Sequence, residues 1–333
     1  KNFAHFLLFM SMFHLVIGPI HRYAQMGQEL KSRPFNILDL RDGLTRFCIG
    51  LFKKVVIANV AGEFVLQYMG GDVAGLNVGL SWFGLVMFAL QIYFDFSGYT
   101  DMALGLGRMF GFRYVENFNY PYLSRSITEF WRRWHMSLSS FLRDYLFTPL
   151  ALSFRRQGKA GLVLATVITF VACGFWHGPT WNFVLWGLYF GLLISIELLF
   201  LNKWLSKLPR ILSHLYFLFA ILLGWVLFYF TDMHQGWRYL NVMFGNTVNP
   251  TLPLEFMLLV KENFYWLVLA LVLCFPVYPA LLHWLGKRPA FALSAPVLVL
   301  RTLALLIMNA ALLALSTAML VGSSFNAFIY GNF

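Results

Sequence analysis

The chain has 333 residues, of which 59% are hydrophobic, 19% are aromatic and only 12% are charged. A soluble domain has about 25% charged residues, so this composition excludes a water-soluble globule and predicts an all-α, polytopic membrane protein. A net charge of +11 is typical of many nucleic-acid-binding proteins, but here the basic residues lie between apolar segments. That distribution is the positive-inside pattern of membrane proteins, and it excludes nucleic acid as the partner.

Eight apolar segments follow one another along the chain. A helix needs roughly 20 apolar residues to cross a bilayer, with about 17 to 25 tolerated. The second segment, with 15 residues, is the shortest. The predicted segments are 3–20, 55–69, 78–96, 160–176, 181–201, 211–230, 264–285 and 297–321.

The basic residues give these segments a direction. If all eight cross the membrane and the chain begins outside, the connections 21–54, 97–159, 202–210 and 285–296 hold 21 of the 25 Lys and Arg. Those connections are therefore predicted on the cytoplasmic side. The chain opens without Met inside an apolar run, so we expect residues 1–333 to form one membrane domain that is the later part of a longer protein.

The connection 97–159 is the longest, and its aromatic content predicts that it packs into the membrane face of the protein. Residues 98–111 mix Gly with apolar residues and fit a short helix, whereas 117–122 contain Asn and Pro and predict an extended or turn segment. A helix is then predicted from Ser126 to Tyr145. Ser126 and Glu129 form a capping box at its start, and Glu129 is placed to pair with Arg133 one turn later.

This predicted helix is amphipathic at the helical period. His135 lies on the border between its two faces. The polar face carries Arg132, Arg133, Ser139, Ser140 and Arg143. The apolar arc consists of Ile127, Phe130, Trp131, Trp134, Leu138, Phe141, Leu142 and Tyr145.

A second focus is the break between two apolar segments at 175–181, Phe-Trp-His-Gly-Pro-Thr-Trp. A helix that begins at Ala160 rises about 25 Å by His177, less than the roughly 30 Å hydrocarbon core. Gly178 and Pro179 prevent its continuation, so His177 is expected at a helix end below the outer surface. An ionisable residue at that depth indicates a functional site. The alternative is a neutral core histidine bonded to a backbone carbonyl.

A set of ordered motifs carries a family resemblance. They are Gly-Pro-Ile-His-Arg-Tyr at 18–23, Gln-Ile-Tyr-Phe-Asp-Phe-Ser-Gly-Tyr-Thr-Asp-Met-Ala at 91–103, Glu-Asn-Phe-Asn-Tyr-Pro-Tyr at 116–122, the run 130–140, Arg-Asp-Tyr at 143–145 and Trp-His-Gly at 176–178. Over most of residues 18–190, and in Phe-Ile-Tyr at 328–330, the chain resembles the membrane-bound O-acyltransferase family. The resemblance is strongest to its bacterial branch of alginate O-acetylation and teichoic-acid D-alanyl transfer membrane proteins.

This resemblance implies a helical core with a tunnel, in the inner membrane of a bacterium, and O-acetylation of a cell-surface polysaccharide. The family's two histidines fall on His177, the expected catalytic residue, and His135. No permanently bound cofactor or metal is implied. The implied partners are an acetyl-CoA or acyl-carrier-protein thioester as donor, a polysaccharide acceptor, membrane lipid and a periplasmic or extracellular acetyltransferase. The residues expected to bind donor or substrate are Trp131, Arg132, Arg133, Trp134, Arg143, Trp176 and Asp95.

The chemistry of acyl transfer suits an imidazole. Moving an acyl group from a thioester to a hydroxyl requires removal of the hydroxyl proton, and general-base catalysis contributes about 10²–10⁴-fold. His177 is expected to be that base, and a basic rim of Arg132, Arg133 and Arg143 suits the phosphates of a donor. The sequence has no metal-ligand spacing, Ser-His-Asp order or nucleotide-binding glycine loop.

Structural roles stay open for several of these residues. His135 is equally suited to a structural hydrogen bond at the helix border. Asp95, at the inner end of its segment, fits an ion pair with an arginine, and Arg132 and Arg133 fit positive-inside anchors.

Two other functions also stay open. One is transfer of D-alanyl or another acyl group to teichoic acid from a carrier protein. The other is non-catalytic transport of a polysaccharide or a lipid-linked intermediate, which is expected to show charges along a path and paired, repeat-like halves.

Overall fold

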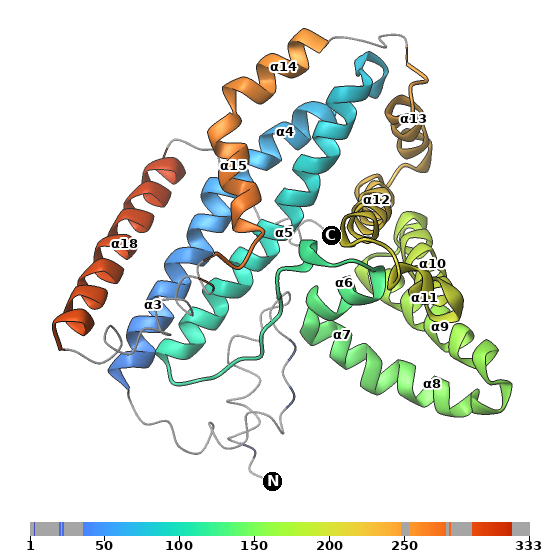
Figure 1. Ribbon diagram of the computed structural model, residues 1–333, viewed down its shortest axis with the longest axis horizontal. Coiled ribbons are helices and arrows are strands. Elements are labelled where there is room, and N and C mark those ends of the chain that lie inside the picture. The colour runs from blue at the N-terminus through green and yellow to red at the C-terminus, as the bar shows by residue number, and fades with distance from the viewer. Residues whose placement is uncertain are drawn as a thin grey trace. The chain divides into compact units, whose positions relative to one another are not determined.

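The computed structural model consists of helices and their connections throughout the part of the chain that it describes (Figure 1). That part comprises residues 36–247, 253–277 and 295–321, together with Phe3, Ile20, Arg22 and Ala280. The chain divides into two compact units. The first consists of residues 1–60, 92–117 and 268–332, and the second of 61–91 and 118–267.

The first unit is organised around two long helical segments, one on each side of an antiparallel seam. Asn36 starts the first segment by accepting a hydrogen bond from the Leu38 N–H at 2.9 Å. The described elements of this unit are α3 (Ile37–Phe52), the π-helical turn η1 (Lys53–Asn59), the second part of α5 (Val78–Met109), the end of α15 (Phe264–Leu273) and α18 (Ala295–Val321).

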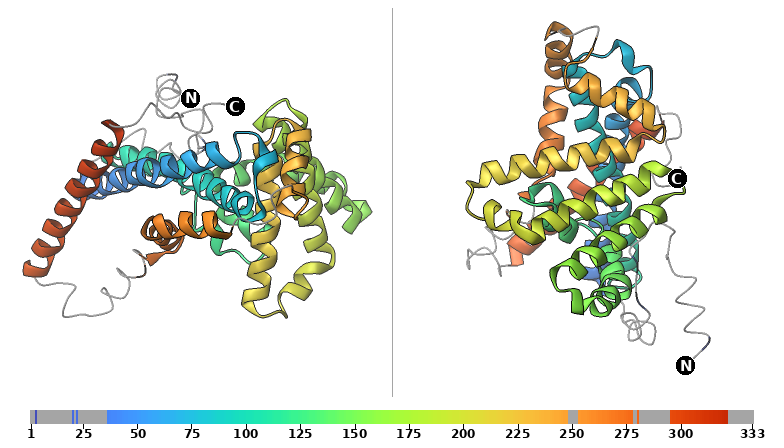
Figure 2. Two further views of the ribbon diagram at one scale, coloured as in Figure 1. Left: turned by 90° about the horizontal axis from the view of Figure 1, so that it is seen from above. Right: turned by 90° about the vertical axis from the view of Figure 1, so that its right-hand side faces the viewer.

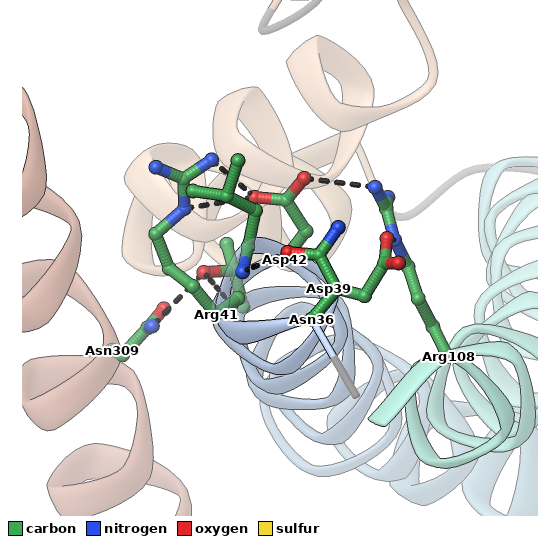
Figure 3. A network of polar contacts seen from close by, with 8 residues as sticks. Asn36, Asp39, Arg41, Asp42, Arg108 and Asn309 are labelled. Atoms are coloured by element: carbon green, nitrogen blue, oxygen red, sulfur yellow. Dashed lines mark hydrogen bonds and ion pairs between the residues drawn. The ribbon is translucent and has the colours of Figure 1, made fainter. Parts of the chain in front are cut away.

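Helix α3 corrects the sequence prediction, which placed all of 21–54 in a connection. Its charged residues lower its hydropathy, but Asp39, Asp42 and Arg46 are paired with charged residues of α5. Arg108 binds Asp39 at 3.0 Å and Asp42 at 2.9 Å, as the close view of Figure 3 shows. Once neutralised in this way, charged side chains are compatible with a packed helix.

Helix α5 is longer than the predicted segment 78–96, because it continues to Met109 and includes most of the expected short helix at 98–111. Asp95 therefore lies in mid-helix and not at a segment end. It pairs with Lys54 of η1 at 2.5 Å, and Asp101 pairs with Lys53 at 2.6 Å. An ion pair for Asp95 is thus confirmed, although its partner is a lysine and not an arginine.

Glycines bring the two helices of this seam together. A Cβ on Gly50 would lie 2.6 Å from the carbonyl oxygen of Gly98, and one on Gly43 would lie 2.6 Å from that of Gly105. Each helix thus places two glycines seven residues apart on the shared face, which permits backbone contact. On another side of α3, Asn309 of α18 donates to the Thr45 hydroxyl at 3.0 Å (Figure 3).

The second unit contains the remaining described helices, and Figure 2 shows α10 and α12 running alongside each other in it. Its elements are α4 (Val60–Tyr68), η2 (Val73–Gly75), the first part of α5, η3 (Pro121–Leu123), α6 (Ile127–Arg133), α7 (Met136–Leu142), the π-helical turn η4 (Arg143–Phe147), α8 (Thr148–Ser153), η5 (Arg155–Gln157), α9 (Lys159–His177), α10 (Trp181–Ile196), the π-helical turn η6 (Glu197–Leu201), α11 (Asn202–Leu205), α12 (Arg210–Tyr229), α13 (Met233–Met243) and α14 (Pro253–Glu262).

Helices α9 and α10 form a tight hairpin, and the predicted break after His177 is confirmed. A Cβ on Gly174 would lie 2.1 Å from the Phe183 carbonyl oxygen, and one on Gly187 would lie 2.2 Å from that of Phe170. Any larger residue at these two positions would force the helices apart. The hairpin therefore has one rigid packing, with His177 next to its turn.

The predicted helix from Ser126 to Tyr145 is interrupted, which corrects the sequence prediction. The Ser126 hydroxyl accepts from the Glu129 N–H as the capping box predicts, and the pair of Glu129 with Arg133 at 2.9 Å is confirmed. The Glu129 carboxylate, however, accepts from the Arg125 N–H and not from that of Ser126. The helix then breaks at Trp134 and His135, so α6 and α7 are separate. The break buries Trp134 and His135, but Phe141 and Tyr145 at the end of the predicted apolar arc are exposed.

Among the described residues, five helices are long and apolar enough to cross a membrane, or six if a pair bent by 67° is one span. They account for six of the eight predicted segments. Segment 3–20 lies almost wholly outside the described residues, and 55–69 is helical but is not among those apolar helices. The candidate spans are Val78–Met109, Lys159–His177, Trp181–Leu205, Arg210–Tyr229, Val299–Val321 and the bent pair Leu254–Glu262 with Phe264–Leu273.

Candidate functional site

His177 is the last residue of α9, and aromatic rings surround it. Its ring centroid lies 4.9 Å from Trp176, 5.1 Å from Trp186 and 5.5 Å from Phe228, each in an edge-to-face arrangement. Gly178 allows the chain to leave α9 here, because a Cβ at that position would lie 2.5 Å from the Phe183 ring. The helix end thus places an imidazole in an aromatic enclosure with restricted rotation.

His135 occupies the break between α6 and α7 and is 4% exposed. Its backbone has φ 45° and ψ 52°, in the left-handed region that non-glycine residues rarely adopt. Such strain costs about 1–3 kcal/mol and persists only where the surroundings enforce it. Here the Asn119 N–H donates to the Arg133 carbonyl at 2.9 Å, which fixes the end of α6.

The two histidines come from separate elements of the second unit and lie next to one another. The Trp176 ring contacts both, with its centroid 6.5 Å from that of His135 and 4.9 Å from that of His177. Burial, and secondarily the charge of His177, lower the pKa of His135 from 6.5 to about 3. His135 is therefore a neutral imidazole at physiological pH, with the Ser137 hydroxyl 3.5 Å from its Nδ1.

Tryptophans build the wall between these groups and the rest of the unit. Trp131 packs against Trp186 and Phe190 of α10, at centroid distances of 5.6 and 5.3 Å. Trp134 packs against Trp225 of α12 at 5.2 Å. Trp131 and Trp134 are buried, whereas Trp176 is 53% exposed. Of the three predicted tryptophans, Trp176 contacts both histidines, whereas Trp131 packs on Trp186, which itself contacts His177.

The predicted basic residues occupy a different environment. Arg132 and Arg143 are exposed, Arg133 pairs with Glu129, and Arg143 pairs with Asp144 at 2.8 Å. Arg132 and Arg133 lie at the end of α6, just before His135, and Arg143 begins η4 after α7. Asp95 belongs to the first unit, where it pairs with Lys54.

Comparison with protein families identifies the group of proteins to which the chain is related. A profile described as the membrane-bound O-acyltransferase family matches residues 1–231, which contain both histidines. The chain belongs to this family.

Individual members of the family are also similar to the chain. A probable alginate O-acetylase of Azotobacter vinelandii is 37% identical over 250 residues, which is 74% of this chain and 48% of that protein. A peptidoglycan O-acetyltransferase of Helicobacter pylori is 36% identical over 74% of the chain and 47% of its own length. A teichoic acid D-alanyltransferase of Streptococcus thermophilus is 31% identical over 62% and 51%. The chain spans about half the length of these curated relatives.

The surroundings of the two histidines contain residues that the sequence did not single out. Trp186, Trp225 and Phe228 enclose the histidines from α10 and α12, and each looks like an ordinary apolar residue of a spanning helix. Glu197 was also missed, although a carboxylate inside an apolar segment is a recognisable signal. Trp186, Trp225 and Phe228 carry no such signal in the sequence, because only the folded chain shows that they contact the residues of the site.

Three buried indole groups of this wall have unusual hydrogen bonding. The Nε1 atoms of Trp131, Trp186 and Trp225 have no hydrogen-bond partner among the described residues. Buried indole N–H groups normally find one. Within the described part of the chain, no cluster of three or more His, Cys, Asp or Glu is arranged to hold a metal ion.

Proposed function

We propose that this chain is the acyl-transfer core of a membrane O-acyltransferase that moves acetyl groups from a thioester to a hydroxyl for O-acetylation of a cell-surface polysaccharide. The observation that carries the proposal is the meeting of His135 and His177 across Trp176 inside an aromatic enclosure. Family membership supports the reaction class, and the similarity to alginate and peptidoglycan O-acetyltransferases supports the acetyl group and a glycan acceptor.

His177 is the proposed general base. As the acceptor oxygen attacks the thioester carbonyl carbon, the imidazole takes the hydroxyl proton, and the C–O bond forms. The tetrahedral intermediate then expels sulfur, the C–S bond breaks, and the proton passes from the imidazole to the thiolate. The indole N–H of Trp186, which packs on His177, is the proposed donor to the developing oxyanion.

His135 has the proposed role of orienting the thioester. It is neutral and buried, so its ring N–H can donate a hydrogen bond to the acyl carbonyl oxygen without bringing a charge into the enclosure. The exposed Arg132 on α6 and Arg143 at the start of η4 offer guanidinium groups to the phosphates of acetyl-CoA. The basic connections, predicted on the cytoplasmic side, place this donor in the cytoplasm of a bacterial cell with the protein in its inner membrane. A periplasmic acetyltransferase partner is proposed to assist O-acetylation of the polysaccharide on the outer side of that membrane.

A carrier-protein thioester is a second candidate donor, favoured by the similarity to teichoic acid D-alanyltransferases. Acidic carrier proteins would use the same basic rim, but as a docking surface and not as a phosphate site. Supplying each thioester alone separates the two donors, because only the true donor supports transfer.

The test is transfer of labelled acetyl from acetyl-CoA to the glycan acceptor by the full-length protein in detergent, comparing the wild type with His177→Ala. We expect the variant to lose at least about 10²-fold in rate, because it lacks the base. His234→Ala, at an exposed histidine of α13, is the matched control and should keep the wild-type rate. Full activity of His177→Ala would remove the proposed mechanism, and transfer only from an acylated carrier protein would assign the second donor.

A further inference from the structure

Glu197 is a carboxylate inside a membrane-spanning helix, and the mechanism above does not use it. It is 0% exposed and lies at the start of the π-helical turn η6, within the span Trp181–Leu205. Carboxylates at such positions are costly unless their oxygens are fully hydrogen-bonded. Its partners therefore indicate what it does.

Both carboxylate oxygens are bonded, and three of their four donors come from the start of α6. One oxygen accepts from the Ile127 N–H at 2.7 Å and from the Tyr216 hydroxyl at 3.1 Å. The other accepts from the Thr128 N–H at 2.8 Å and from the Thr128 hydroxyl at 2.6 Å. The first N–H groups of a helix have no partner within it, so Glu197 satisfies donors that would otherwise be buried and unpaired.

These bonds fix the start of α6, and His135 follows two residues after the end of this helix. Helix α6 packs through Trp131 on Trp186 and Phe190, and His135 in the break after it contacts Trp176. The same α9–α10 hairpin carries Glu197 and His177. A shift of α6 by one residue would move His135 by about 1.5 Å relative to His177. Apolar contacts alone tolerate such sliding, whereas four directional hydrogen bonds do not.

We infer that Glu197 is a positioning residue for acyl transfer: its carboxylate holds the start of α6 on the hairpin and thereby sets the place of His135 relative to His177. This inference rests on the proposed function. Glu197 touches neither histidine, so its effect passes through the register of α6. The π-helical turn fits this role, since such turns frequently occur at functional sites.

Glu197→Gln is the test variant, because it keeps the size of the side chain but replaces one accepting oxygen by an NH₂ group. That group cannot accept the hydrogen bonds that the start of α6 and Tyr216 donate to the carboxylate. Ser195→Ala is the matched control: Ser195 is buried two residues away on the same helix and bonds only its own helix, at the Gly191 carbonyl. Tyr216→Phe is a milder variant that removes one donor and leaves α6 bonded. The three proteins and the wild type are compared as full-length chains in detergent.

Two readouts are measured. In Glu197→Gln we expect amide hydrogen exchange in residues 126–135 to become about tenfold faster, the equivalent of one charge-assisted hydrogen bond. We expect kcat to fall about 100-fold, as for a misplaced catalytic group, with little change in KM for the thioester. Tyr216→Phe should show a smaller change in both, and Ser195→Ala should show neither. A merely structural role would lower the melting temperature without this separation of kcat from KM.

The outcomes separate the two proposals. Wild-type kcat in Glu197→Gln, or a loss of kcat without faster exchange in 126–135, would overturn the positioning role. If Glu197→Gln does not fold, the same two criteria apply to Tyr216→Phe. A wild-type protein that transfers no acyl group from either thioester would reject the proposed function instead. Unchanged amide hydrogen exchange of residues 126–135 in the Glu197 and Tyr216 variants would then also show that Glu197 does not fix the start of α6.

Discussion

At the scale of single residues, His135 is both buried and held in a strained backbone conformation. A left-handed backbone at a histidine is uncommon, and it is maintained by the bond of Asn119 to Arg133 and by the packing of Trp134 on Phe118 at 5.1 Å. Because the imidazole is buried at this point, the folded protein resists protonating it. The same feature that places the ring therefore makes the folded state sensitive to pH.

We expect this histidine to contribute to acid instability. Its pKa is about 3 in the folded protein and 6.5 ordinarily, so between these values the unfolded chain binds a proton that the folded chain does not. The free energy of unfolding should thus be unaffected above pH 6.5 and should decrease as pH falls below it. Replacing His135 by Asn removes the titration, and Asn tolerates the left-handed backbone.

The measurement is the melting temperature in detergent at about pH 7.5 and about pH 5. The decrease between them should be smaller in His135→Asn than in the wild type. His234→Ala, which changes an exposed histidine, should reproduce the wild-type decrease. Equal decreases in all three proteins would mean that His135 does not titrate differently on folding.

At the scale of elements, the seam between α3–η1 and α5 combines close backbones with paired charges. From one end to the other, Arg108 meets Asp39 and Asp42, Asp101 meets Arg46 and Lys53, and Asp95 meets Lys54. The order along one helix is the reverse of that along the other, so the pairing sets both the direction and the register of the two helices. Glycines on the shared face make the approach possible.

Gly98→Ala should be strongly destabilising for a single added methyl group. Its Cβ would lie 2.7 Å from the Gly50 carbonyl oxygen, and backbone cannot move aside as a side chain can. Overpacking typically costs about 1–3 kcal/mol, and we expect the upper end of that range. Thermal unfolding in detergent measures it, with Gly71→Ala as the control, since no atom lies within 4 Å of a Cβ there. Equal stability of the two variants would show that the seam can open.

At the scale of the whole molecule, the protein is a multi-pass membrane protein that buries several polar side chains and exposes many large apolar ones on its candidate spans. Exposed leucine, isoleucine and phenylalanine side chains gather on α9, α10, α12 and α18, whereas Glu197, Asn182 and Asp95 are buried. This is the distribution expected when lipid is the solvent. It agrees with the multi-pass character inferred from composition.

The orientation can be tested across one span. Helix α12 has 20 residues, and its length of about 30 Å matches the hydrocarbon core. The distribution of Lys and Arg predicts that Ser206, before it, faces the cytoplasm and that His234, after it, faces outside. Both side chains are exposed, so Ser206→Cys and His234→Cys can report on the two ends.

We expect a membrane-impermeant maleimide applied to intact cells to label His234→Cys and not Ser206→Cys. Permeabilised cells should show labelling of both, which is the control for reactivity. The native Cys48, Cys173 and Cys274 are buried and should give a low background. Labelling of Ser206→Cys alone in intact cells would reverse the orientation.

The sequence by itself determined the class of the protein, its family and two helix boundaries. Composition requires a membrane environment, Gly178 and Pro179 require a helix to end at His177, and Ser126 with Glu129 requires one to begin. These are local effects of solvent, backbone geometry and capping, and each of the two helix boundaries is confirmed. The ordered motifs were also sufficient for the family.

Only the tertiary structure decided how these residues meet. The charged helix α3 and the extension of α5 depend on ion pairs between segments about fifty residues apart, such as Lys53 with Asp101, which local hydropathy cannot register. The break at His135 overrides a continuous amphipathic pattern, because burying Trp134 and His135 requires contacts with Phe118 and Trp225 elsewhere in the chain. The hold of Glu197 on α6 joins residues 69 and 70 positions apart. Local patterns depend on neighbours in sequence, whereas the site depends on neighbours in space.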